Sequence, residues 1–169
     1  AWQPGDLAYL CQLARPSVAV CLNASAAHLA HYASVDAIAA TKGEIFEGLA
    51  GNGLAVINAD QKWLPQWREQ AGTARQVTFG LAEDADYRAT DIEHRGMKGS
   101  HFQLRAAVGS QPVSLPLPRR QHDNLLLIVV RGWVAPRRGE QALRPGRVPP
   151  LLLGPALHGP RLVHLSAHP

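Results

Sequence analysis

One lysine of the sequence lies where the residue pattern predicts a buried helix face. Lys42 follows Val35 and Ile38 at spacings of seven and four residues along a predicted helix. Ile45 and Phe46 come one turn later on the same apolar stripe. Two interpretations are open. Either the aliphatic stem covers the core while the ammonium reaches solvent, or desolvation lowers the pKa of the amine enough for covalent chemistry on the nitrogen.

Polar side chains follow two apolar segments that are typical of buried strands. Ligands of parallel α/β sheets bind outside the carboxyl ends of the strands. The candidate site residues are therefore Asn23 and His28 after the first segment, and Asn58 and Asp60 after the second. His28 taken alone is a weak signal, because the sequence has no HExxH pattern. The loops GxxxxGK[ST], GxGxxG and GxSxG are also missing, so the residues alone do not reveal an autonomous active site.

The elements that must position these residues alternate between helix and strand. Apolar spacing predicts helices at 6–14 and 34–47, the second capped by Ser34. A short tryptophan-bearing helix is expected within 61–75, and strands are expected at 18–22, 54–57 and 76–79. This alternation indicates a mostly parallel sheet with helices on both faces. From Asp86 the apolar period changes to two, which predicts a small antiparallel sheet of three strands at 87–94, 100–107 and 111–117.

Charge and proline content divide the chain near Pro118. The net charge is +4 overall, but residues 1–118 hold 9 basic and 11 acidic residues, whereas residues 119–169 hold 8 arginines and 2 acids. We therefore expect a globular domain over 1–118 and an irregular basic tail over 119–169. The tail has one aromatic residue, Trp133, so it lacks the stacking platforms of a nucleic-acid-binding module.

The cysteines and the N-terminal residues indicate the compartment. Cys11 and Cys21 match no metal-binding or CxxC spacing and lie in apolar surroundings, which favours buried, reduced thiols. The first residues carry neither an initiator methionine nor the pattern of a secretory signal, and no apolar run has membrane length. We expect a piece of a longer, monomeric cytoplasmic protein.

Four segments together resemble a known family. They are GDLAYLCQLARP, LNASAAHLAHYASVDAIAATKGEIFEGL, GLAVINAD and VSLPLP. In this order and separation they resemble the central, ATP-binding domain of the Mur ligases over about residues 3–118. The KGEIFEGL string favours the branch that adds D-alanyl-D-alanine to UDP-N-acetylmuramoyl-tripeptide in peptidoglycan precursor synthesis. Folylpolyglutamate- and cyanophycin-synthetase-type ligases of the same superfamily remain alternatives.

The resemblance implies a fold, a reaction and site residues. The fold would be an incomplete P-loop-type α/β domain. The reaction would be ATP-dependent: a substrate carboxylate becomes an acyl phosphate, an amine attacks it, and magnesium balances the phosphate charge. The family's carbamylated lysine, which positions magnesium, corresponds to Lys42, and its magnesium-binding histidine corresponds to His28. Asn58 and Asp60 match a box on the nucleotide side of the site.

The chain also departs from the family pattern. The phosphate-binding GKT loop would lie upstream of Ala1, so we expect the isolated chain to be inactive. Where the family has a nucleotide-contacting GRHNxxN segment, the chain reads RRQHDN, and only Asn124 matches the last asparagine. A loss of reading frame between Pro118 and Leu127 would explain both this departure and the composition of the tail.

The frame hypothesis predicts what the coding DNA contains. Downstream of the codon for Pro118, one of the other two reading frames should encode a helical, alanine-rich continuation of a Mur ligase. Sequencing the gene and its flanks and translating all frames checks this, and the hypothesis fails when neither frame continues the family pattern.

Overall fold

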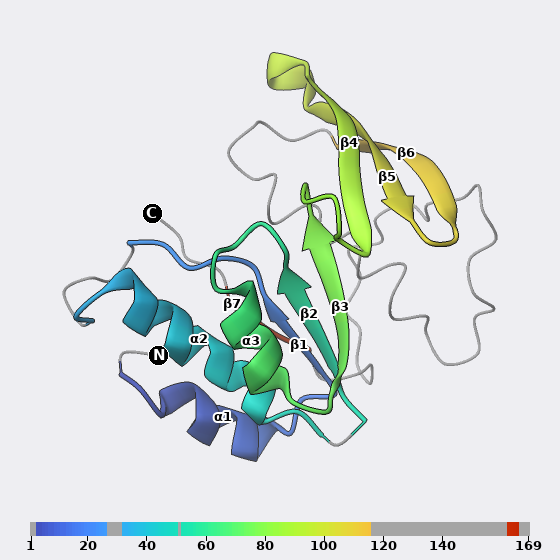
Figure 1. Ribbon diagram of the computed structural model, residues 1–169. Coiled ribbons are helices and arrows are strands. Elements are labelled where there is room, and N and C mark those ends of the chain that lie inside the picture. The colour runs from blue at the N-terminus through green and yellow to red at the C-terminus, as the bar shows by residue number, and fades with distance from the viewer. Residues whose placement is uncertain (1–2, 27–31, 51, 116–161, 166–169) are drawn as a thin grey trace. The chain divides into compact units, whose positions relative to one another are not determined.

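The computed structural model describes residues 3–26, 32–50, 52–115 and 162–165 (Figure 1). The described residues form two compact units. One contains the residues up to Thr78 together with 162–165, and the other begins at Phe79. All of the candidate residues that the structure describes lie in the first unit.

The first unit has the predicted alternation of helices and strands. Its elements are α1 (Asp6–Ala14), β1 (Val18–Cys21), α2 (Val35–Glu47), β2 (Leu54–Asn58), α3 (Leu64–Ala71), β7 (Leu162–Leu165) and the first residues of β3 (Arg75–Gly80), which continues into the second unit. Strands β1 and β2 are neighbours and run parallel, with Val18 paired to Leu54 and Cys21 paired to Ile57. The strand order is β3-β2-β1-β7. The expectation of a mostly parallel α/β sheet is confirmed.

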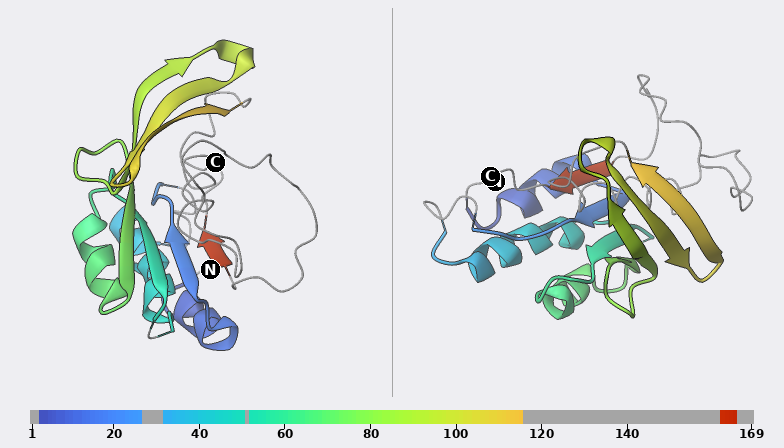
Figure 2. Two further views of the ribbon diagram at one scale, coloured as in Figure 1. Left: turned by 90° about the vertical axis from the view of Figure 1, so that its right-hand side faces the viewer. Right: turned by 90° about the horizontal axis from the view of Figure 1, so that it is seen from above.

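The described helices form one layer rather than covering both faces of the sheet. All three contribute to a single core cluster with alternate residues of β1 and β2, and Figure 2 shows α2 and α3 on the same side of the strands. The strand order explains this difference from the prediction. Right-handed crossovers that step through β1, β2 and β3 in one direction place successive helices on the same face.

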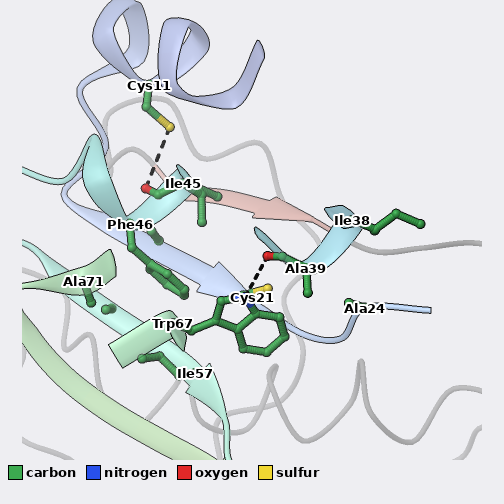
Figure 3. Packing of buried hydrophobic residues seen from close by; sticks show 12 residues of the cluster. Cys11, Cys21, Ala24, Ile38, Ala39, Ile45, Phe46, Ile57, Trp67 and Ala71 are labelled. Atoms are coloured by element: carbon green, nitrogen blue, oxygen red, sulfur yellow. Dashed lines mark hydrogen bonds between the residues drawn. The ribbon is translucent and has the colours of Figure 1, made fainter. Parts of the chain in front are cut away.

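The core cluster joins this helical layer to the sheet (Figure 3). Trp67 is fully buried, and its indole Nε1 donates a hydrogen bond to the carbonyl of Ala39 at 2.9 Å. The Cys11 thiol lies 3.8 Å from the carbonyl oxygen of Ile45 and donates to it. Both Cys11 and Cys21 are buried, as their apolar surroundings predicted.

The second unit contains the predicted three-stranded antiparallel sheet. β4 (Tyr87–His94) pairs with β5 (Ser100–Ala106), and β5 pairs with β6 (Gly109–Leu115). Phe79 and Gly80, the residues of β3 that belong to this unit, pair in parallel with the start of β4. The short 3-10 helix η1 (Gly96–Lys98) connects β4 to β5. The period-two pattern therefore located all three strands to within about two residues.

The tail differs in one place from the irregular structure that its composition indicated. Leu162–Leu165 forms β7, which pairs in parallel with β1 along its whole length. Four residues are too few for a periodic signal, and pairing along the free edge of β1 cannot be read from the sequence around residue 162. The predicted boundary at residue 118 lies outside the described residues and stays a prediction.

No helix in the part of the chain that the structure describes has both the length and the apolar character needed to cross a membrane.

Two glycines allow the neighbouring helices to approach α2 closely, namely Gly43 within the helix and Gly48 at its C-terminal end. A Cβ atom on Gly48 would overlap the Cβ of Cys11 in α1, and a Cβ on Gly43 would overlap the amide oxygen of Gln70 near the end of α3. The Glu44 carboxylate between them accepts hydrogen bonds from the main-chain nitrogens of Gly5 at 2.8 Å and Ala8 at 3.3 Å. Glu44 thus caps the start of α1, which has no cap from its own side chains.

Gly48→Ala is expected to lower the free energy of unfolding by about 1–3 kcal/mol, because the new methyl group meets the rigid Cβ of Cys11. Gly43→Ala is the matched control. Its methyl group meets the end of the Gln70 side chain, which can rotate away at the loss of two hydrogen bonds, and alanine favours the helix, so the loss should be smaller. Urea denaturation of the 169-residue chain measures both, and equal losses for the two variants would contradict the packing argument.

Candidate functional site

The carboxyl end of β1 is joined to the carboxyl end of β2 by the side chain of Asn58. Its Nδ2 donates to the carbonyl of Leu22 at 2.7 Å, and its Oδ1 accepts from the main-chain nitrogen of Asp60 at 2.8 Å. Asn58 is 4% exposed, whereas Asp60 is exposed at the start of the following loop. The Asn58 amide therefore shapes this edge of the sheet, and the nucleotide-side role of both residues stays a prediction.

Asn23, the residue after Leu22 in the loop that follows β1 (the exit loop of β1), is the hydrogen-bond partner of Lys42. The Lys42 Nζ donates to the carbonyl oxygen of Asn23 at 2.7 Å. Among the described residues this carbonyl is its one hydrogen-bond partner, and no carboxylate pairs with the amine. The predicted position of Lys42 on the inward face of α2 is confirmed, and its head lies at the carboxyl end of the strands rather than in bulk solvent.

Burial controls the electrostatics around Lys42. Desolvation lowers the pKa of the Lys42 amine below its ordinary value of 10.5, and a negative charge on Cys21 would raise it. Burial in turn raises the pKa of the Cys21 thiol to about 12, so the thiol stays neutral at physiological pH. Only the desolvation then acts, and a larger fraction of the amine is neutral than for an exposed lysine.

One further residue holds the loop after β1 and was not singled out from the sequence. The Gln61 Oε1 accepts from the main-chain nitrogen of Ala24 at 3.2 Å. A loop glutamine carries no spacing signal, so this contact could not have been found without the fold.

Asn23 contributes one more polar atom at this place. Its side-chain Oδ1 is buried and has no hydrogen-bond donor among the described residues. Asn23 thus holds the lysine through its main-chain oxygen and has a buried side-chain oxygen without a hydrogen-bond donor in the described part of the chain.

The chemistry that this arrangement supports is nucleophilic addition by an amine. The neutral form of an amine is the one that reacts with electrophiles, and burial favours this form at Lys42. The carbamate and magnesium roles that the resemblance implied for Lys42 stay predictions. Among the described residues no three His, Cys, Asp or Glu side chains form a ready metal site. The open oxygen of Asn23 is of the type that magnesium accepts. His28 and Asn124, the other predicted site residues, lie outside the described part of the chain.

Comparison with known proteins gives one family over most of the described chain. The family model for the Mur ligase middle domain matches residues 3–128. UDP-N-acetylmuramoyl-tripeptide--D-alanyl-D-alanine ligase from Escherichia coli (strain K12) is 40% identical over 120 residues, which are 70% of this chain and 26% of the relative. The chain therefore spans about a quarter of the length of the curated relatives it matches.

Solved structures give the same result. A crystal structure of MurF from Acinetobacter baumannii matches with a TM-score of 0.68 at 29% identity, covering 76% of this chain and 28% of that one. The MurF ligase from Thermotoga maritima in complex with ADP matches with a TM-score of 0.63 at 28% identity, covering 78% of this chain and 30% of that one.

The lowered pKa of Lys42 predicts a pH dependence of stability. Between the lowered pKa of the folded state and 10.5, the unfolded chain binds more protons, so the Lys42 contribution to stability rises with pH. Below this window both states are charged and the full burial penalty applies. In urea titrations, the unfolding free energy of the wild type minus that of Lys42→Met should therefore increase from about pH 7 to about pH 10. Parallel pH curves for the two proteins would contradict it.

Proposed function

The chain belongs to the Mur ligase family through its middle domain, and on that premise we propose that it is part of an ATP-dependent ligase of the bacterial cytoplasm. The reaction would join D-alanyl-D-alanine to UDP-N-acetylmuramoyl-tripeptide and form a precursor of peptidoglycan. The relative that is 40% identical carries this activity in its name, and the KGEIFEGL string of the chain supports the same branch.

One observation carries the assignment of the site. Lys42 points its amine to the carboxyl ends of β1 and β2, with only a main-chain carbonyl as its hydrogen-bond partner in the described part of the chain. A structural lysine at a buried place is normally paired with a carboxylate. An amine that is desolvated and unpaired is instead suited to react with carbon dioxide and to carry a negative carbamate in place of its positive charge.

The residues around Lys42 then have distinct tasks. The carbonyl of Asn23 orients the Lys42 Nζ. Asn58, at the end of β2, holds the carbonyl of the preceding residue, Leu22. The carbamate of Lys42, with His28, would hold magnesium, and Asp60 and Asn124 would lie on the ATP side. When bound, magnesium would neutralise the charge that develops as the phosphoryl group moves to the substrate carboxylate.

Lys42→Ala in a full-length ligase that carries this segment should lower turnover by about 100-fold or more, because the anion that orients the metal is lost. Short carboxylic acids should restore part of the rate by occupying the place of the carbamate. Phosphate release that depends on UDP-N-acetylmuramoyl-tripeptide and D-alanyl-D-alanine is the measurement.

Two variants serve as controls for this experiment. Lys42→Arg keeps a long cationic donor for the Asn23 carbonyl but cannot form the carbamate, and it should be as inactive as the alanine variant. Lys62→Ala removes an exposed lysine that pairs with Asp36 at 2.9 Å and should leave turnover unchanged. Full activity of Lys42→Arg would remove carbamate chemistry from the proposal.

A further inference from the structure

The side-chain oxygen of Asn23 is a buried acceptor for which the described residues show no structural role. This Oδ1 is shielded from solvent and accepts no hydrogen bond in the described part of the chain. A buried acceptor without a donor costs about 1–3 kcal/mol relative to one that is paired or exposed. An apolar residue would avoid this cost, so stability alone does not account for an asparagine here.

Gln70 provides a comparison within the same unit. Its Oε1 is also buried without a donor, but its Nε2 donates to the carbonyl of Ala40 at 3.1 Å and to Glu47 at 3.0 Å. Those two bonds hold the Gln70 amide in place, and the orientation of its oxygen against Gly43 follows from them. The amide of Asn23 has no such bonds among the described residues, so no internal contact explains where its oxygen lies.

The position of Asn23 suggests what its oxygen is for. The main-chain oxygen of the same residue accepts from the Lys42 Nζ at 2.7 Å, so the unpaired acceptor belongs to the residue that positions the amine. On carbamate formation the Nζ lone pair forms the bond to the carbon of carbon dioxide, and one proton leaves Nζ for water. The remaining N–H continues to donate to the Asn23 carbonyl, and the group that Asn23 holds becomes an anion.

We propose that Asn23 is a cation-binding residue of the Lys42 site, whose Oδ1 contacts a hydrated divalent cation such as Mg²⁺ directly or through a bound water. This inference rests on the proposed carbamate at Lys42. An amide oxygen is a suitable ligand for a hard cation, and a metal-bound water is a suitable donor to it. Either contact supplies the partner that the buried oxygen lacks.

The experiment follows the carbamate itself rather than turnover. The 169-residue chain is incubated with ¹³C-bicarbonate, and the carbamate carbon is measured by NMR during a titration with MgCl₂. The wild type should give a signal that is absent in Lys42→Arg and that increases with Mg²⁺. In Asn23→Leu the Mg²⁺ concentration at half-maximal increase should rise about 10-fold or more. The free energy of unfolding of this variant should stay equal or increase, because an unpaired polar atom has been removed.

Asn52→Leu is the matched control, because it changes the same residue type at an exposed place before the amino end of β2. It should give the wild-type Mg²⁺ response. Asn23→Asp tests the inference independently of how well leucine is accommodated, since a carboxylate of nearly the same shape should lower the Mg²⁺ midpoint.

Several results would overturn the inference. They are a wild-type Mg²⁺ response in Asn23→Leu, a loss of stability in that variant, an unchanged or raised Mg²⁺ midpoint in Asn23→Asp, or no carbamate signal in the wild type. A carbamate that forms normally but ignores residue 23 removes only this inference. The proposed ligase activity fails separately, when a full-length protein releases no phosphate with the two substrates.

Discussion

The fold of the first unit depends on how the chain leaves β1. Leu22, Asn23 and Ala24 follow the last residue of the strand, and their main-chain groups lose the partners that the sheet provides. Each of these groups is satisfied by a side chain from another element, respectively Asn58, Lys42 and Gln61. Buried main-chain groups without partners are costly, so these contacts determine where β2, α2 and the loop before α3 can lie.

This arrangement gives the amine of Lys42 two tasks that do not conflict. As a donor it satisfies a main-chain carbonyl, and for that task an ammonium, a neutral amine and a carbamate N–H are all adequate. As a nucleophile it requires the neutral form, which burial promotes. The hydrogen bond to Asn23 therefore does not depend on the charge of Lys42, and the residue can change its charge state without breaking the contact that positions it.

The periodic features of the fold were predictable and the long-range ones were not. The position of Lys42 on an apolar stripe, the Ser34 cap of α2 and the change of period at Asp86 are local patterns, and the structure contains each of them. Ser34 accepts from the nitrogen of Ala37 at 3.1 Å as the capping rule requires. These features depend on residues within a few positions of one another.

The remaining features depend on residues that are distant in sequence. The single helical layer follows from the order of the strands, which local patterns do not contain. Glu44 caps a helix that begins 38 residues before it, at Asp6, and Asn58 uses both ends of its amide within the protein. The sequence analysis identified Asn58 from its place at a strand end, but its hydrogen bonds became visible only when β1 and β2 were paired.

The close approach of Gly48 to Cys11 makes the residue that position 48 can hold depend on helix α1. Position 48 must lack a side chain only as long as position 11 has a Cβ at this distance. Helix α1 therefore cannot be exchanged between relatives as an independent cassette unless the residues that meet α2 are exchanged with it. The same turn of α2 follows Lys42 by six residues, so a chimera that forced the helices apart here would also rotate or shift the lysine. A graft that is to keep Lys42 in place therefore has to carry both helices together with the loop after β1 that accepts its hydrogen bond.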